Sequence, residues 1–185
     1  MREIEIKARV ADKAKLVGIL AEHGVTLTPP MTQHDRVYGV RGVSGASENS
    51  EPWLRIRQET AAGATTNYFT LKRSVTNQLD SIEHEVTVGD AEELERLILA
   101  LDFVPYSDLT KIRQKAHLTD AIEICVDTVE PLGDFIEAEM LCADDADPEK
   151  VVAQLWDILA PYGVTREAAV TDGYDVLMNK YLGKQ

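Results

Sequence analysis

Residues 2–10 have the sequence REIEIKARV, in which charged and apolar side chains alternate. Side chains two positions apart point to the same face of a β-strand, so this alternation predicts a strand with one ionised face and one apolar face. One face carries Glu3, Glu5, Lys7 and Arg9, and the other carries Ile4, Ile6, Ala8 and Val10. The recurrence of this pattern along the chain determines the expected fold.

The rest of the chain predicts further strands and four helices. Alternation and β-prone residues predict strands over 32–40, 53–60, 67–74, 81–88, 111–118, 121–127 and 134–142, with strand character resuming at Phe103. Leucine and isoleucine at helical spacing, together with candidate capping aspartates, predict helices over 11–24, 90–101, 147–159 and 172–181. Residues 39–52 are rich in glycine and serine and are expected to form an exposed hairpin loop.

The composition fits one globular domain that spans residues 1–185. No apolar stretch approaches the roughly 20 residues of a membrane span, and the N-terminus lacks the apolar run of a signal peptide, so we expect a cytoplasmic protein without a membrane partner. The net charge of −13 argues against nucleic acid as a partner. Cys125 and Cys142 lack zinc-type spacing and are expected to be free thiols.

Charged residues form stripes on one face of nearly every predicted strand. Each stripe holds residues two positions apart, and acids and bases occur in nearly equal number. A solvated face of a half-buried sheet is the simplest explanation of such stripes. The later stripes comprise Arg55 with Arg57, Lys72, Glu83 with Glu85, Lys111 with Arg113 and Lys115, Glu123 with Asp127, and Glu137 with Glu139.

Two features favour a charged interior over a solvated face. Lysine and glutamate are poor strand formers, and the leucine-rich helices need an apolar sheet surface to cover. If the apolar faces point outward against the helices, the charged faces line a barrel, where charges persist only when they are paired, metal-bound or bound to a ligand. Clustered carboxylates bind magnesium or manganese, and lysine and arginine bind phosphate oxygens, so a polyphosphate bridged by metal fits both.

Several short motifs occur in a fixed order along the chain. They are EIEIK over 3–7, WLRIR over 53–57, TLKR over 70–73, EHE over 83–85, KIR over 111–113, ICVD over 124–127 and LGDFIEAE over 132–139. This ordered set resembles the CYTH family, also called triphosphate tunnel metalloenzymes, which includes class IV adenylyl cyclases and thiamine triphosphatases. The resemblance covers essentially the whole chain. It implies an α+β fold, an eight-stranded antiparallel β-barrel with flanking α-helices, in agreement with the strand pattern.

The resemblance also implies roles for individual residues. The implied ligands of Mg²⁺ or Mn²⁺ are Glu3, Glu5, Glu137, Glu139 and Asp127, the last either as a ligand or as a partner that orients another group. The implied triphosphate clamp comprises Lys7, Arg55, Arg57, Lys72, Lys111 and Arg113, and the implied catalytic residues are Glu3, Glu5, Lys7 and Glu137. The roles of Glu83, Glu85, Lys115 and Arg9 stay open.

The expected partner is a small-molecule triphosphate, namely ATP, tripolyphosphate or thiamine triphosphate. Residues 126–135, VDTVEPLGDF, resemble the corresponding segment of class IV adenylyl cyclases and favour the conversion of ATP to cyclic AMP and pyrophosphate. A triphosphate phosphohydrolase is the alternative, because the same residues would serve it. A non-catalytic module that binds polyphosphate or nucleotides is a further alternative, and the chain is expected to be a monomer or a homodimer.

Overall fold

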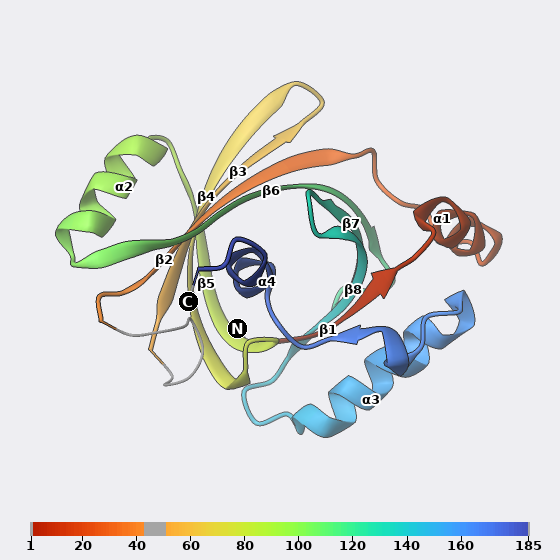
Figure 1. Cartoon of the computed structure of the whole chain (residues 1–185). Helices are drawn as coiled ribbons and strands as arrows, with labels where there is room; N and C mark the ends of the chain where they lie inside the picture. The colour runs from red at the N-terminus through yellow and green to blue at the C-terminus, as the bar shows by residue number, and fades with distance from the viewer. Residues whose placement is uncertain (1, 43–50, 185) are drawn as a thin grey trace.

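The computed structural model describes residues 2–42 and 51–184, and Figure 1 shows a ring of strands with helices around and inside it. The helices are α1 (Lys13–Glu22), α2 (Ala91–Ala100), α3 (Pro148–Leu159) and α4 (Tyr174–Tyr181), with short 3-10 turns over Ala160–Tyr162 and Arg166–Ala168. The strands are β1 (Arg2–Val10), β2 (Met31–Val40), β3 (Trp53–Ala61), β4 (Ala64–Asn77), β5 (Asp80–Val88), β6 (Phe103–His117), β7 (Ile122–Val129), β8 (Gly133–Cys142) and the two-residue β9 (Ala169–Val170).

The eight long strands close into a barrel because the first strand pairs on two sides. Their order is β5-β4-β3-β2-β6-β7-β8-β1, and β1 also pairs with β5 in antiparallel orientation. Strand β1 runs beside β8 over its whole length, with Glu5 opposite Glu139. Across the β1–β5 seam, the buried side chain of Arg2 forms a salt bridge of 2.8 Å with Asp80. The predicted α+β fold with an eight-stranded antiparallel barrel is therefore confirmed.

The apolar faces of the strands point outward and lie under helices. Ile4 of β1 belongs to one buried cluster with Leu20 of α1 and Leu155 of α3. Ile56 of β3 and Ile98 of α2 belong to a second cluster. Burying a side chain of this size contributes about 1.5–3 kcal/mol. The hydrophobic stabilisation of the barrel therefore comes largely from its outer face, which leaves the inner face available for charged residues.

Three of the helices begin at the predicted capping aspartates. Asp12, Asp90 and Asp147 each accept a hydrogen bond from a backbone N–H in the first turn of α1, α2 and α3 respectively. Such a cap supplies an acceptor to an N–H that has no partner within the helix, and it typically stabilises a helix by about 1 kcal/mol. The sequence signals for these three helices therefore correspond to physical contacts.

The fourth helix lies inside the ring of strands in Figure 1. Tyr174 and Met178 of α4 pack in one cluster with Leu109 of β6, Val129 of β7 and Phe135 of β8. The sequence predicted a short helix here but not its place, because an eight-residue helix with one apolar face can lie on either side of a barrel wall. Helix α4 brings its first turn next to the charged faces of the strands.

Two further predictions have different outcomes: the strand that resumes at Phe103 is longer than expected, and most of the predicted loop 39–52 lies outside the described residues. Strand character that resumes at Phe103 belongs to the single 15-residue strand β6, which continues through the predicted strand 111–118 as far as His117. Of the predicted loop 39–52, residues 39–40 end β2, and residues 43–50 lie outside the described residues. Within the described ranges, the helices are all too short or too polar to cross a membrane.

Candidate active site

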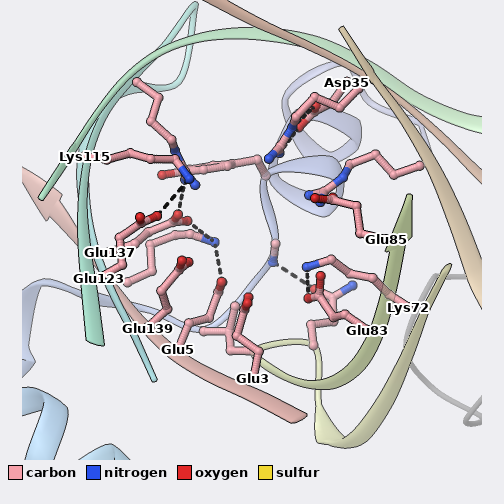
Figure 2. Close-up of a pocket in the computed structure, with 18 of the residues that line it drawn as sticks. Glu3, Glu5, Asp35, Lys72, Glu83, Glu85, Lys115, Glu123, Glu137 and Glu139 are labelled. Atoms are coloured by element: carbon pink, nitrogen blue, oxygen red, sulfur yellow. Dashed lines mark hydrogen bonds and ion pairs between the residues drawn. The ribbon is translucent and has the colours of Figure 1, made fainter. Parts of the chain in front are cut away.

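The charged faces of the strands line a cavity of about 680 Å³ inside the barrel. Ten carboxylates and seven lysines or arginines belong to the described residues of its lining. Figure 2 shows such side chains converging from the surrounding strands. The lining includes the predicted clamp residues Lys7, Arg55, Arg57, Lys72, Lys111 and Arg113, and the predicted metal ligands Glu3, Glu5, Glu137 and Glu139.

On one side of the cavity, basic residues are held by carboxylates from neighbouring strands. Arg57 of β3 donates two hydrogen bonds of 2.6 Å to Asp35 of β2. Lys72 of β4 forms an ion pair with Glu83 of β5. Burial opposes both positive charges, but the facing carboxylates raise the pKa of Arg57 and that of Lys72. Both groups therefore stay protonated and oriented, as a binding site for phosphate oxygens requires.

Arg55 of β3 has a donor that the protein does not use. Its Nη2 atom donates to Thr70 Oγ1 at 3.2 Å and to Glu85 Oε2 at 3.4 Å. Its Nε atom is buried and finds no hydrogen-bond partner in residues 2–42 and 51–184. Because Arg55 lines the cavity, this N–H is available to an acceptor on a bound ligand.

Arg113 of β6 lies between two carboxylates. It donates to the two oxygens of Asp127 at 2.7 and 2.5 Å and also to Glu137. Tyr174 of α4 donates a hydrogen bond of 3.0 Å to Asp127, and Lys7 forms an ion pair of 3.2 Å with Glu137. Burial opposes ionisation of both carboxyls, but the charge of Arg113 lowers the pKa of Asp127 and that of Glu137. This network fixes Arg113 in one position.

The network separates two predicted metal ligands from the others. Asp127 is fully buried and is absent from the described lining of the cavity, so it fits the predicted alternative of a partner that orients another group, here Arg113. Glu137 lines the cavity but is engaged by Arg113 and Lys7. The assignment of Asp127 and Glu137 as metal ligands stays a prediction, and it would require each carboxylate to share or exchange these contacts.

The positive charge of Lys111 of β6 is only weakly compensated by neighbouring carboxylates. Its Nζ atom lies 3.5 Å from Asp127 Oδ2 and 4.9 Å from the centre of the Tyr174 ring. Burial, followed by repulsion from Arg113, lowers the pKa of Lys111 to about 8. A bound phosphate would supply a nearby negative charge and favour the protonated form of this lysine.

Three carboxylates gather where β1 lies beside β8. Oxygen atoms of Glu3, Glu5 and Glu139 lie within 4.8 Å of one another. Among the residues that the structure describes, no lysine or arginine forms an ion pair with Glu3 or Glu139, whereas Lys7 Nζ lies 3.6 Å from Glu5 Oε1. Burial raises the pKa of Glu3 to about 7, and burial together with neighbouring carboxylates raises those of Glu5 and Glu139.

This group fits a hard divalent cation. Closely spaced carboxylates repel one another when they ionise, and a doubly charged ion with oxygen ligands removes that repulsion. Among the described residues of the lining, carboxylates also outnumber lysines and arginines, ten against seven. Of the predicted ligands, Glu3, Glu5 and Glu139 are therefore the residues that would hold Mg²⁺ or Mn²⁺ without first giving up a contact with Arg113.

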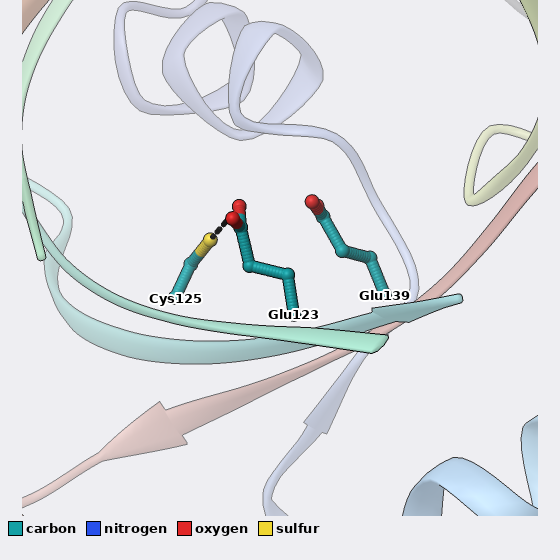
Figure 3. A group of neighbouring side chains, drawn as sticks. All are labelled: Glu123, Cys125 and Glu139. Carbon is teal, nitrogen blue, oxygen red and sulfur yellow. Dashed lines mark hydrogen bonds between the residues drawn. The ribbon is translucent and has the colours of Figure 1, made fainter. Parts of the chain in front are cut away.

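A second group of possible metal ligands includes Glu139 and also contains the thiol of Cys125. The sulfur of Cys125 and oxygens of Glu123 and Glu139 lie within 4.8 Å of one another. Figure 3 shows these three side chains. The Cys125 thiol donates to Glu123 Oε1 at 3.4 Å, and burial raises its pKa well above the usual range. The thiol is therefore protonated and helps to orient Glu123. Cys125 and Cys142 are both free, as predicted.

The residues whose roles were left open fall into two groups. Glu83 and Glu85 line the cavity and contact the bases of β3 and β4 described above. Lys115 also lines the cavity and forms an ion pair of 2.8 Å with Glu123. Arg9 is exposed and donates to a main-chain carbonyl in the turn between β7 and β8. The first three therefore belong to the tunnel, and Arg9 has a structural contact outside it.

Sequence reasoning missed several residues of the cavity, among them Asp35, Tyr174 and Asp175. Asp35 follows the strand parity of β2, but its neighbours on that face, Gln33 and Val37, are uncharged and form no stripe. Tyr174 and Asp175 come from α4, whose position inside the barrel had no sequence signal. A search for single acids at inward parity, opposite a predicted arginine, would have found Asp35.

Residues 1–174 match the family model described as the CYTH domain. The chain belongs to the CYTH family. Members of this family process triphosphates in a tunnel of this kind with the help of a divalent metal, so the protein is a triphosphate-acting tunnel enzyme.

Individual relatives agree with the assignment to the CYTH family. The chain is 28% identical over 179 residues to "Putative adenylate cyclase MJ0240" of Methanocaldococcus jannaschii, covering 94% of this chain and 97% of that protein. The PH1819 protein of Pyrococcus horikoshii has the same fold, with a TM-score of 0.82, 24% identity and coverage of 96% and 99%. "Putative adenylyl cyclase HpAC1" of Hippeastrum, described as having a dominant triphosphatase activity, aligns with a TM-score of 0.61, 16% identity and coverage of 100% and 96%.

Proposed function

We propose that this CYTH protein is an adenylyl cyclase of the class IV type, which converts ATP to cyclic AMP and pyrophosphate with Mg²⁺ or Mn²⁺. The observation that carries the proposal is the cavity of about 680 Å³, in which a basic clamp faces a cluster of carboxylates. Cavities of about 300–1,000 Å³ bury most of a drug-sized ligand, so this one has room for an organic group beside the phosphates. The name of the archaeal relative and the segment 126–135 support the cyclase type.

The protein contributes mainly position and charge to this reaction. The ribose 3′-oxygen forms a bond to the α-phosphorus, the bond from that phosphorus to the bridging oxygen breaks, and pyrophosphate leaves. Lys72, Arg57 and Arg113 would neutralise the charge that develops on the leaving pyrophosphate, since each is already oriented by a carboxylate. The arginines can grip two oxygens at once, while a lysine acts as a point charge.

Glu3, Glu5 and Glu139 would hold the divalent cation, which when bound favours loss of the 3′-hydroxyl proton and neutralises phosphate charge. Lys7 lies beside this group, 3.6 Å from Glu5 and 3.2 Å from Glu137. Burial opposes its charge, but Glu137 and then Glu5 raise the pKa of Lys7, so it remains a cation between the carboxylates and the clamp. It would guide a phosphate oxygen toward the carboxylate cluster.

A triphosphate phosphohydrolase, acting on inorganic tripolyphosphate or thiamine triphosphate, is the second candidate. Water would attack a terminal phosphorus in the same cage, and the clamp and the carboxylates would have the same tasks. The description of the Hippeastrum protein shows that this fold also serves triphosphatases. A non-catalytic binding module is disfavoured, because Glu3, Glu5 and Glu139 form a carboxylate cluster in which Glu3 and Glu139 have no ion pair with a lysine or arginine of the described residues. Such a cluster has no use in binding an anion without metal.

A product assay tests the proposal. Purified protein with Mg²⁺ or Mn²⁺ is offered ATP, thiamine triphosphate and tripolyphosphate separately, and cyclic nucleotide, pyrophosphate and orthophosphate are resolved. We expect cyclic AMP and pyrophosphate in equal amounts from ATP. Orthophosphate as the main product from any of the three would overturn the cyclase in favour of the hydrolase. Tight binding without turnover would indicate the binding module.

The Glu5→Gln variant tests the metal assignment in the same assay. It retains the size of the side chain but removes a charge from the carboxylate cluster, so we expect metal-dependent turnover to fall at least a hundredfold, as for loss of a major catalytic electrostatic contact. Manganese binding, followed by the paramagnetic signal of free Mn²⁺, should weaken in parallel. Wild-type turnover in this variant would remove Glu5 from the metal site.

A further inference from the structure

Asp175, in the first turn of α4, has no task in the reaction described above. It is 7% exposed and lines the cavity. Its Oδ2 atom is buried and has no hydrogen-bond partner within residues 2–42 and 51–184. Burial raises its pKa, which the N–H of Val176 and the charge of Lys7 oppose. A buried acceptor without a hydrogen-bond partner is unfavourable, so we expect this oxygen to have a partner that binds in the cavity.

The neighbouring glycine provides the space for this carboxylate. Gly173 has a φ of −65°, which any residue adopts, so its backbone conformation does not require glycine. A Cβ atom at this position would overlap Asp175 Oδ1. The N–H of Gly173 donates to Gln78 Oε1 at 2.9 Å, which holds the segment in place. The local backbone therefore accommodates one carboxylate oxygen closely and leaves the other without a partner.

The chemistry of the free oxygen excludes the phosphates as its partner. Asp175 in its charged form only accepts hydrogen bonds, and the oxygens of an ionised triphosphate also only accept. A phosphate beside Asp175 would in addition be repelled by it. The group that satisfies Oδ2 must carry a donor, such as a hydroxyl or an amino group, and on a triphosphate substrate such donors belong to the organic part.

The same cavity also has an apolar wall with a free donor. Trp53 lines the cavity and packs against Val37, and its Nε1 atom is buried without a hydrogen-bond partner in the described chain. Lys72 Nζ lies 5.3 Å from the centre of the Trp53 ring, and Lys72 is also one of the cations whose charge acts on Asp175. A flat ring with polar edges suits such surroundings better than a phosphate does.

We propose that Asp175 recognises the organic group of the triphosphate by accepting a hydrogen bond from one of its hydroxyl or amino groups, with Trp53 as an apolar wall of the same cavity. This inference rests on the proposed function, because it takes the substrate to be an organic triphosphate. The phosphates would lie among the clamp residues, and the organic group would lie toward α4. Asp175 would thus distinguish a nucleoside triphosphate from tripolyphosphate.

Calorimetric titration with methylene-bridged, non-cleavable analogues of ATP and of tripolyphosphate tests this inference. A hydrogen bond to a charged group contributes about 1.5–3 kcal/mol, so Asp175→Ala should weaken binding of the ATP analogue about ten- to a hundredfold. Binding of the tripolyphosphate analogue should stay within about twofold of wild type or tighten. Gly173→Ala, whose Cβ displaces the carboxylate, should show the same selective loss.

Asp172→Asn is the matched control. Asp172 lies just before α4, its side chain pairs with Lys180 in the last turn of that helix, and the residue is not part of the described lining. This variant should change neither affinity. Equal weakening of both analogues by Asp175→Ala, or no effect on either, would overturn the inference. If Asp175→Ala fails to fold, Gly173→Ala is used instead: selective weakening of the ATP analogue supports the inference, and equal weakening of both analogues or no effect overturns it.

Analogues that lack one donor identify the source of the hydrogen bond. The 2′-deoxy and 3′-deoxy forms remove ribose hydroxyls, and the inosine form removes the amino group of the base. The analogue that lacks the donor to Asp175 has no hydrogen bond to lose, so it should bind with equal affinity to wild type and to Asp175→Ala. If all three still distinguish the two proteins, the hydrogen bond is disproved. Failure of the proposed function looks different, because wild type would then make no cyclic AMP while its selective binding persisted.

Discussion

Arg57 and Asp35 illustrate how single side chains prepare the tunnel. Arg57 projects from β3 and meets Asp35 of β2 through two hydrogen bonds of 2.6 Å. The pairing fixes the plane of the guanidinium and leaves one of its edges for other acceptors. Burial opposes ionisation of Asp35, but Arg57 holds the pKa of Asp35 well below its usual range. The cation is thus positioned before any ligand arrives.

Replacing Arg57 by alanine should weaken binding of tripolyphosphate much more than binding of monophosphate. The loss should be about ten- to a hundredfold for tripolyphosphate, because a charge-assisted contact is removed and the Asp35 charge is left to repel the ligand. Titration calorimetry with both ligands measures it. The double variant Arg57→Ala with Asp35→Asn is the control, and it should recover part of the affinity. A similar loss for both ligands would contradict a clamp that spans several phosphates.

At this scale, parity predicted the charged stripes, and the resemblance to the CYTH family implied that Glu3, Glu5 and Glu139 belong to one site. Strand geometry sends every second residue to the same face, so a stripe is visible in the sequence. The pairings were not predictable, because they depend on which strands become neighbours. Asp127 illustrates the limit, since its opposition to Arg113 across β6 and β7 gives it a cation partner that the motif does not reveal.

Strand β1 closes the barrel, and a single arginine joins its edge to β5. Arg2 donates to both oxygens of Asp80 at 2.8 and 2.9 Å. It also donates to the carbonyls of residues 144 and 146 at 2.9 Å each, which links the start of β1 to the segment before α3. Within the described residues, three residue pairs join β1 to β5, so the contacts of Arg2 add substantially to this seam.

Replacing Arg2 by methionine should destabilise the protein by about 3–5 kcal/mol, because it leaves Asp80 buried without its partner. Urea unfolding followed by circular dichroism measures the change. Arg2→Met combined with Asp80→Leu is the control and should recover most of the stability, since no unpaired charge then remains. A loss below about 1 kcal/mol for Arg2→Met alone would mean that the seam does not depend on this pair.

Some helices and strands could be predicted from the sequence more completely than others. The capped helices and the alternating strands have local signals, and these appear in the structure near the expected positions. Strand β6 was recognised only in part, because its first half, Phe103–Thr110, has few paired charges and does not alternate strictly. The place of α4 depends on its packing against β6, β7 and β8, which no local signal encodes.

The whole molecule has a net charge of −13, and the raised pKa of Glu3 links the stability of the protein to pH. Burial, partly opposed by Lys72, raises the pKa of Glu3 from 4.5 to about 7. The folded protein therefore holds this proton more tightly than the unfolded chain does. The stabilisation is fully present below about pH 4.5 and is lost as the pH rises through about 7, because ionised Glu3 then remains buried beside other carboxylates.

We therefore expect Mn²⁺ to raise the melting temperature more at pH 8 than at pH 5.5. A proton competes with the metal at the lower pH, whereas at the higher pH the metal relieves the repulsion among ionised carboxylates. Differential scanning calorimetry at both pH values, with and without Mn²⁺, measures the effect. Glu3→Gln should reduce the difference between the two pH values. An equal rise at both would argue against metal binding by this cluster.

The double pairing of β1 has a consequence for how the protein is made. Glu5 leaves the ribosome well before its neighbour Glu139, because the two residues are 134 positions apart in the chain (139 minus 5). At about 5–20 residues per second, the first strand waits on the order of ten seconds for β8. An unpaired strand edge invites association with other chains, and charged side chains discourage it. The glutamates and the lysine of β1 that later line the tunnel therefore also protect the nascent chain while it has no partner.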